Sequence, residues 1–260
     1  MSNRPEVEHT RESALTFFLA YTEKNKDLLQ SRKVCDLSAG RGYIAHLFEK
    51  AGSDVHAYDL FPDQNKFLKS QVRKIDLQQK FPDENDSMDL VLCCETIEHL
   101  PNQYFLFQEA ARIVKEGGTF ILTTPNSSSL RSRFSQFMME SEHYGAPAPN
   151  ELNAFTSWDN SKEGYFSKLF ISGVLRLRTL AALNKLTLKK IHPTQRSSTS
   201  KLLLFWYPVL YYFNWKAMKK QIKNDPPNAD TYRTIFKLNT SMDVLLGKHL
   251  IMEFEKKQMR

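Results

Sequence analysis

The chain has 260 residues, 41% of them hydrophobic and 25% charged, which is the composition of an ordinary globular protein. Its longest uncharged apolar run, residues 202–215, has 14 residues, whereas a membrane-spanning helix needs about 20. The three cysteines are odd in number and lie in apolar runs, and residues 1–30 contain no apolar signal-peptide core. These features predict a cytoplasmic protein with reduced thiols and argue against a secreted, disulfide-bonded one.

The first half of the chain alternates predicted helices and strands. An amphipathic helix is expected over residues 7–29, ahead of the first strand. Short apolar runs predict five strands, at residues 33–37, 54–58, 72–75, 88–93 and 119–124. Apolar residues with helical spacing lie between these strands, around residues 44–51, 64–70 and 103–114. This alternation is typical of an α/β domain built on a parallel sheet.

The second half has a weaker pattern. Residues 127–160 are rich in Ser, Pro, Asn and Glu and predict a long irregular loop with one helical piece. The elements expected after it are a helix at 169–186, a sixth strand at 187–192, a seventh strand at the start of 197–215, and one or two helices within 229–257. The chain then divides into three parts: an N-terminal helix (1–30), a ligand-binding domain (31–195), and a C-terminal extension that shapes substrate access (196–260).

Acidic residues follow the predicted strands beside a glycine-rich turn. The first strand runs into Asp36, Gly40 and Gly42 before a helix, and such a turn lets a ligand approach the helix N-terminus. Asp59 ends the second strand, where a carboxylate can accept hydrogen bonds from both hydroxyls of a ribose. Asp76 ends the third strand. Because the carboxyl ends of parallel strands share one edge of a sheet, the pattern predicts a ligand that crosses this edge.

Five motifs occur in order between residues 33 and 126, namely DLSAGRG, VHAYD, KIDL, MDLVLCCETIEHL and RIVKEGGTFILTTPN. Together they resemble the class I (Rossmann-like) S-adenosylmethionine-dependent methyltransferases, and especially the small-molecule branch that includes the ubiquinone-biosynthesis O-methyltransferases. The resemblance implies a doubly wound, mostly parallel seven-stranded α/β sheet with one antiparallel strand. It also implies S-adenosylmethionine as the cofactor, bound by these motif residues: Asp36, Ser38, Ala39, Gly40, Gly42, Asp59, Leu60, Asp76, Leu77, Cys94 and Glu95.

The glycine-rich turn leaves two questions open. Ser38 stands where the family motif has its first glycine. If this position has a positive φ, a serine there costs about 1 kcal/mol and weakens cofactor binding, whereas otherwise its hydroxyl can add a hydrogen bond. Residues 40–45 also satisfy the dinucleotide pattern G-x-G-x-x-A, so a nicotinamide or flavin site is the rival interpretation. That pattern does not explain Asp36 or Asp76.

Glu95, Glu98 and His99 form an E-x-x-E-H motif just past the fourth strand, with a spacing that can place all three on one face of a helical turn. We take His99 and Glu98 as the candidate catalytic residues, with His99 as the general base for an acceptor hydroxyl. Alternatively, the three side chains hold a divalent ion, or His99 only caps its helix. If the motif holds a divalent ion, its resemblance to the E-x-x-E-H motif of the small-RNA 3′-terminal methyltransferases implies that the ion is Mg²⁺, with His143 as a further ligand.

Positive charge is concentrated in the second half, which has a net charge of +11 against −4 for residues 1–126. Most of the excess lies within residues 161–224 and favours an anionic acceptor. The basic residues of this region that we expect to attract an anionic acceptor are Arg176, Arg178, Lys189, Lys190, Arg196 and Lys201. Residues 201–220 combine aromatic side chains with lysines, which suits contact with a membrane surface but also packing on the sheet or on a second subunit.

The leading function hypothesis is O-methylation of a small-molecule, glycan or lipid-linked acceptor, because no N-P-P-Y-type or cysteine-nucleophile motif is present. An RNA 2′-hydroxyl methyltransferase is the second hypothesis, with the basic region binding phosphates, but the sequence contains no recognisable RNA-binding module. A non-catalytic, S-adenosylmethionine-binding protein at the membrane periphery is the third. The sequence does not indicate the oligomeric state.

Overall fold

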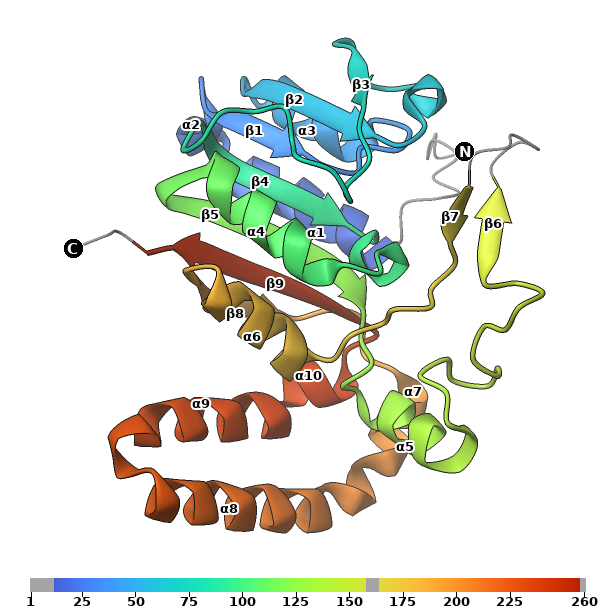
Figure 1. Ribbon diagram of the computed structural model, residues 1–260, viewed down its shortest axis with the longest axis vertical. Coiled ribbons are helices and arrows are strands. Elements are labelled where there is room, and N and C mark those ends of the chain that lie inside the picture. Colours follow the sequence, from blue (N-terminus) through green and yellow to red (C-terminus); the bar gives the residue numbers. More distant parts are fainter. Residues whose placement is uncertain (1–11, 158–163, 258–260) are drawn as a thin grey trace.

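A single large sheet forms the core of the protein (Figure 1). The computed structural model describes residues 12–157 and 164–257. The strands of this sheet are β1 (Lys33–Asp36), β2 (Asp54–Asp59), β3 (Val72–Lys74), β4 (Met88–Cys94), β5 (Val114–Pro125), β8 (Leu186–His192) and β9 (His249–Lys256). Their order is β3-β2-β1-β4-β5-β9-β8, and β9 is antiparallel to both of its neighbours while β1 to β5 pair in parallel. The predicted doubly wound, mostly parallel seven-stranded sheet is confirmed.

Helices cover both faces of this sheet (Figure 1). The α-helices are α1 (Glu12–Lys24), α2 (Lys26–Leu29), α3 (Tyr43–Lys50), α4 (Gln103–Ile113), α5 (Leu130–Met139), α6 (Val174–Leu183), α7 (Ser198–Leu202), α8 (Tyr207–Asn224), α9 (Ala229–Thr240) and α10 (Met242–Leu246). Short 3₁₀ turns are η1 (Pro62–Gln64), η2 (Ile97–His99), η3 (Leu203–Trp206) and η4 (Pro226–Asn228). A separate antiparallel pair, β6 (Phe155–Ser157) and β7 (Gly164–Phe166), lies beyond the end of the sheet.

Strand β4 shows how one strand serves two hydrophobic cores. Successive side chains of a strand point to opposite faces, so Leu90 and Leu92 pack with α1 and α3 through Phe18 and Phe48. The residues between and after them, Val91 and Cys93, pack on the other face with α4, α6 and β9. Because both faces are covered, the strand is an almost continuous apolar run without polar alternation.

The segment between β2 and β3 is not the helix predicted over residues 64–70. Only the short turn η1 forms there, and the chain then follows an irregular path. Asn65 explains this path, because its side chain accepts a hydrogen bond from the backbone N–H of Leu68 and donates one to its carbonyl, both at 3.0 Å. The N–H of Lys66 bonds to the carbonyl of Arg41, 2.9 Å away. Side-chain and tertiary hydrogen bonds thus replace helical ones.

The seventh strand is also misplaced in the sequence prediction. Residues 197–215 begin with helix α7, whose N-cap Ser197 accepts a hydrogen bond from the N–H of Ser200. The strand is instead β9, within the tail expected to be helical. Residues 7–11 of the helix expected over 7–29 lie outside the described residues, and the remainder forms α1 and α2.

Helices α8 and α9 form a hairpin that projects away from the sheet (Figure 1). They pack against each other through contacts such as the Tyr211–Phe236 ring pair, with centroids 5.1 Å apart. None of the residues of α8 is buried. The base of the hairpin joins the domain through a small cluster that includes Leu130, Leu203 and Leu245.

The position of β9 makes a testable prediction about stability. Phe254 is fully buried and contacts the rings of Phe107 and Phe120, with centroids 5.8 and 6.0 Å apart. We expect Phe254→Ala to lower the free energy of unfolding by about 3–5 kcal/mol, measured by urea denaturation. Phe213→Ala, at an aromatic residue that is 62% exposed on α8, is the matched control and should change it by less than about 0.5 kcal/mol. Equal losses would show that β9 is not an integral strand of the core.

Candidate functional site

The glycine-rich turn connects the carboxyl ends of β1 and β2. Asp36, the last residue of β1, accepts a hydrogen bond from the N–H of Ser38 at 3.1 Å. Asp59, the last residue of β2, accepts one from the N–H of Gly40 at 2.7 Å and another from the N–H of Phe61 at 2.8 Å. Burial nevertheless raises the pKa of Asp59 above its usual value, against the opposing effect of these backbone donors. The turn therefore carries its carboxylates at the edge of the sheet, as the sequence predicts.

The two glycines of the turn have different roles. Gly40 has a φ of +52°, and a side chain placed on it would meet no atom of residues 12–157 or 164–257 within 4 Å, so these residues leave space beside the turn at this point. Gly42 has a φ of +82°, and a side chain there would collide with Asn65 and Leu68. The first glycine thus leaves room for a ligand, and the second lets helix α3 start close to the following loop.

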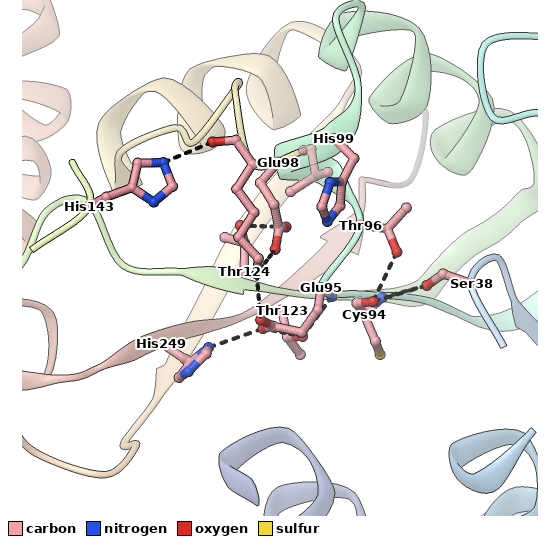
Figure 2. Close-up of polar contacts among 12 residues, drawn as sticks. Ser38, Cys94, Glu95, Thr96, Glu98, His99, Thr123, Thr124, His143 and His249 are labelled. Carbon is pink, nitrogen blue, oxygen red and sulfur yellow. Dashed lines mark hydrogen bonds and ion pairs between the residues drawn. The ribbon is translucent and has the colours of Figure 1, made fainter. Parts of the chain in front are cut away.

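Ser38 carries no left-handed strain, because its φ is not among the positive values of the described residues. Its hydroxyl accepts a hydrogen bond from the backbone N–H of Cys94 at 2.8 Å and donates to the carbonyl of the same residue at 3.3 Å. The side chain therefore ties the turn after β1 to the end of β4 (Figure 2). Of the two alternatives that the sequence left open for Ser38, the structure therefore shows added hydrogen bonds and not the cost of a positive φ.

Asp36 is a buried carboxylate with a free acceptor. The side chain is 1% exposed, and its Oδ2 atom has no hydrogen-bond partner among the described residues. Burial raises the pKa of Asp36 to about 7; the N–H of Ser38 opposes this shift, and the charge of Asp59 adds to it. A cationic group bound beside these two carboxylates would relieve the cost of burying them, so this end of the site favours a ligand with positive charge.

The remaining predicted cofactor residues surround the turn at different depths. Asp76 lies just after β3 and accepts a hydrogen bond from the N–H of Gln78 at 2.9 Å. Leu77 is buried in the hydrophobic core, and Leu60 is half-buried after β2. Ala39 is buried, and its N–H bonds to the carbonyl of Tyr58 at 2.8 Å. These residues lie in or beside the segments that follow β1, β2 and β3.

The E-x-x-E-H motif does not form the helical turn expected from its spacing. Glu95 follows β4 with a φ of +52°, and only Ile97–His99 form the 3₁₀ turn η2. Glu95 points toward β5 and β9, where its Oε1 lies 3.1 Å from both Thr123 Oγ1 and His249 Nδ1 (Figure 2). The three side chains therefore do not share one face, because the reversal at Glu95 separates it from the other two.

Glu98 is completely buried. Its carboxylate accepts a hydrogen bond from Thr124 Oγ1 at 3.0 Å and pairs with the ammonium of Lys168 at 2.9 Å. The same ammonium lies 3.9 Å from Glu95 Oε2, so Lys168 stands between both carboxylates of the motif. This lysine comes from the segment after β7 and neutralises negative charge that would otherwise be costly to bury.

His99 is oriented from the opposite side of the site. Its Nδ1 lies 2.6 Å from the carbonyl oxygen of Phe166 and must donate to it, which leaves Nε2 as an unprotonated acceptor in the neutral ring. Tyr165 packs edge-on against the His99 ring, with centroids 5.1 Å apart, and lies 6.1 Å from the ring of Phe61. Burial and the charge of Asp59 raise the pKa of Tyr165. Strand β7 thus covers the space between the ends of β2 and β4.

The donor set does not fit the divalent ion considered from the sequence. No group of three or more His, Cys, Asp or Glu side chains within residues 12–157 and 164–257 is arranged to hold a metal. His143 contacts the carbonyl of Lys168, 3.1 Å from its Nε2, and does not reach the motif. We therefore derive no metal-dependent step.

Sequence reasoning missed Lys168, Thr124, His249 and Tyr165. Each is distant from the motif in sequence, and His249 lies on β9, which was expected to be helical. No local pattern in the sequence pointed to these four residues.

Comparisons with known proteins agree with this architecture. A profile of the methyltransferase domain family matches residues 7–162. The ubiquinone biosynthesis O-methyltransferase of Bordetella avium is 28% identical over 107 residues, which is 38% of this chain and 44% of that protein. The protein of the same name from Xanthomonas oryzae pv. oryzae is 31% identical over 117 residues, or 42% of this chain and 48% of that protein. The chain therefore matches about half the length of these relatives.

A crystal structure of an S-adenosylmethionine-dependent methyltransferase from Mesorhizobium loti superposes with a TM-score of 0.52 and 11% identity, covering 90% of this chain and 97% of that one. A likeness at this identity speaks only for the fold. The strand order also differs from the 3-2-1-4-5-6 order of dinucleotide-binding domains, because here the antiparallel strand β9 lies between β5 and β8. The chain belongs to the methyltransferase domain family and has the fold of the class I S-adenosylmethionine-dependent methyltransferases.

Proposed function

We propose that this protein transfers a methyl group from S-adenosylmethionine to an oxygen atom of a small-molecule acceptor. The observation that carries the proposal is the pair of carboxylates at the strand ends, the buried Asp36 and the half-buried Asp59, beside Gly40. When bound, S-adenosylmethionine supplies a methyl group on a positively charged sulfur. The named O-methyltransferase relatives support oxygen as the atom that is methylated.

The chain's own residues fit this cofactor. Asp59 retains lone pairs for ribose hydroxyls beyond those used by Gly40 and Phe61, and the free Oδ2 of Asp36 suits a cationic group. The segment after β3 borders the same edge and is proposed to contact the adenine. The complete set proposed to bind the cofactor remains Asp36, Ser38, Ala39, Gly40, Gly42, Asp59, Leu60, Asp76, Leu77, Cys94 and Glu95.

S-adenosylhomocysteine binding tests this proposal without an acceptor. At about 100 times its Kd it should stabilise the native state by about 2.7 kcal/mol, seen as a rise in Tm. Asp59→Asn should lower its affinity by about 10-fold or more, because one oxygen that accepts hydrogen bonds is lost. Asp63→Asn, at an exposed neighbour in η1, should leave the affinity unchanged. Stabilisation by NADH with no effect of S-adenosylhomocysteine would contradict the proposal.

We assign the general base to His99. Its Nδ1 is engaged with the Phe166 carbonyl, so Nε2 is the atom that would accept the proton of an acceptor hydroxyl. Glu98 is too deeply buried for direct proton exchange with an acceptor, and we propose that it positions Lys168. The lysine would in turn stabilise negative charge that develops on the acceptor oxygen.

Two substitutions at His99 separate catalysis from structure. Asparagine can reproduce the Nδ1 donor but supplies no base, whereas alanine removes both. We expect His99→Asn and His99→Ala both to lower the methylation rate by about 10²-fold. The rate is followed as S-adenosylhomocysteine released with 3,4-dihydroxybenzoate as a soluble phenol. Wild-type activity in His99→Asn alone would assign a structural role, and activity lost in chelator and restored by Mg²⁺ would contradict the base assignment.

We propose that the chain from residue 127 onward selects the acceptor and shapes substrate access. Two cations of the basic region are paired with carboxylates, which makes them less available to RNA phosphates. Lys189 pairs with Glu255 at 3.0 Å, and Arg196 lies 3.8 Å from Asp243. This pairing favours a small acceptor over a nucleic acid, whose binding depends on many free cations.

We also propose that α7, η3 and α8 contact an anionic membrane surface. Such a contact would allow the protein to methylate a lipid-linked acceptor. Residues 198–224 contain no Asp or Glu. Leu202, Phe205 and Phe213 are 75%, 66% and 62% exposed, and lysines follow on the outer face of α8. None of the described helices is long and apolar enough to span a bilayer. The pattern suits a helix that lies on the surface.

Vesicle co-sedimentation tests this contact. Binding should be stronger to vesicles containing phosphatidylglycerol than to phosphatidylcholine vesicles. Lys216→Glu combined with Lys220→Glu should weaken it by about 10-fold or more, since each basic residue near an anionic surface contributes about 1 kcal/mol. Arg233→Glu combined with Lys237→Glu on α9 is the matched control. Equal loss in both double variants would show that only net charge matters and would contradict a specific contact through α8.

A further inference from the structure

A cavity of about 410 Å³ lies between α5 and the N-terminus of α6, separate from the cofactor turn. Its polar lining comes from two parts of the chain distant in sequence: Ser127, Arg133, Gln136 and Glu142 from one, and Ser172 and Arg176 from the other. The cavity is open to solvent and has room for a small polar group. No residue of the E-x-x-E-H motif lines it.

Two guanidinium groups face this cavity without a carboxylate partner in the described part of the chain. Arg133 donates only to neutral groups, the carbonyl and the side-chain oxygen of Asn239, at 3.4 and 2.6 Å. Burial lowers the pKa of Arg133 to about 10, which leaves the group charged at neutral pH. Arg176 lines the same cavity and is exposed to solvent. The cost of holding the partly buried cation of Arg133 beside neutral partners would be relieved by an anion in the cavity, whereas the exposed Arg176 carries no such cost and would add attraction for that anion.

The start of α6 adds further donors. Gly173 is its N-cap residue and provides no side-chain cap, although the hydroxyl of Ser128 accepts a hydrogen bond from the N–H of Val174 at 2.9 Å. The next N–H groups of the first turn have no helical partner, and the helix dipole favours negative charge at this end. Arginine forks, hydroxyls and helix N–H groups are the donors that bind phosphate oxygens.

The cavity is connected rigidly to the candidate active site. Ser172 Oγ donates to Gln103 Oε1 at 2.6 Å, and the Nε2 of Gln103 donates to the carbonyls of Ile97 and Phe170, at 3.0 and 2.6 Å. The N–H of Phe170 bonds to the carbonyl of Glu98 at 2.9 Å. The segment from Lys168 to Ser172 therefore lines the cavity at one end and contacts the E-x-x-E-H motif at the other.

We propose that this cavity binds a phosphate group carried by the methyl acceptor, through Arg133, Arg176 and the N-terminus of α6. The acceptor is thus a phosphorylated small molecule or a lipid-linked phosphate, and this part of the inference rests on the proposed methyltransferase function. The phosphate would anchor the acceptor while its hydroxyl reaches His99. Glu142, which also lines the cavity, would oppose anion binding.

Direct binding of inorganic phosphate tests the site without turnover. Titration calorimetry at constant ionic strength, with chloride as the reference anion, should show saturable binding to the full chain. We expect Arg176→Gln to weaken it by about 10-fold or more, because a charge-assisted, bidentate partner is lost. Arg178→Gln, two residues along the same helix and outside the cavity lining, should bind like the wild type. Glu142→Gln should bind more tightly because a repelling charge is removed.

The outcomes distinguish this site from the proposed function. No saturable phosphate binding, or equal weakening in Arg176→Gln and Arg178→Gln, overturns the cavity assignment even if S-adenosylhomocysteine still binds. Failure of S-adenosylhomocysteine binding with phosphate binding intact instead overturns the methyltransferase proposal. Vesicles containing phosphatidic acid identify the source of the phosphate. Weaker vesicle binding in Arg176→Gln supports a lipid-linked acceptor, and loss of inorganic phosphate binding alone supports a soluble one.

Discussion

Two carboxylates, the buried Asp36 and the half-buried Asp59, lie at the ends of adjacent parallel strands, and the arrangement of the site follows from the groups that compensate their charge. A carboxylate that leaves water must accept hydrogen bonds or remain protonated. The chain supplies backbone N–H groups from Ser38, Gly40 and Phe61, so the turn must fold back over both strand ends. This compensation is incomplete at Asp36, and the remaining negative potential is what a cationic cofactor would complete.

At the E-x-x-E-H motif, a buried carboxylate is compensated by a side chain and not by backbone N–H groups. Glu98 is buried beside Thr124, and Lys168 supplies the opposite charge within 2.9 Å. Because the same ammonium approaches Glu95, one lysine neutralises the part of the motif that could otherwise attract a divalent cation. The lysine lies just after β7, and the last residue of β7, Phe166, fixes the tautomer of His99 through its carbonyl. Charge balance and base orientation therefore share one structural support.

The second half of the chain carries the features that we propose contact the acceptor. The cationic cavity beside α6 and the aromatic, lysine-rich face of α8 both lie outside the segments that form the cofactor turn. Such a division lets one part of a fold retain its ligand chemistry while another part changes the acceptor. Strand β9 joins the two parts physically, because it follows the α8–α9 hairpin and then lies between β5 and β8 in the core.

The sequence by itself determined the fold class, the first five strands and the placement of the glycine turn and its acids at one edge of the sheet, because these depend on local signals: apolar runs, a glycine turn and acids at strand ends. It misplaced β9 because a strand covered on both faces lacks the alternation that distinguishes strands from helices. Only the tertiary structure decided that Ser38 binds Cys94, that Lys168 separates the two glutamates, and that Arg133 and Arg176 meet in one cavity. These contacts join residues far apart in the chain, and no local pattern encodes which distant side chain will satisfy a buried charge.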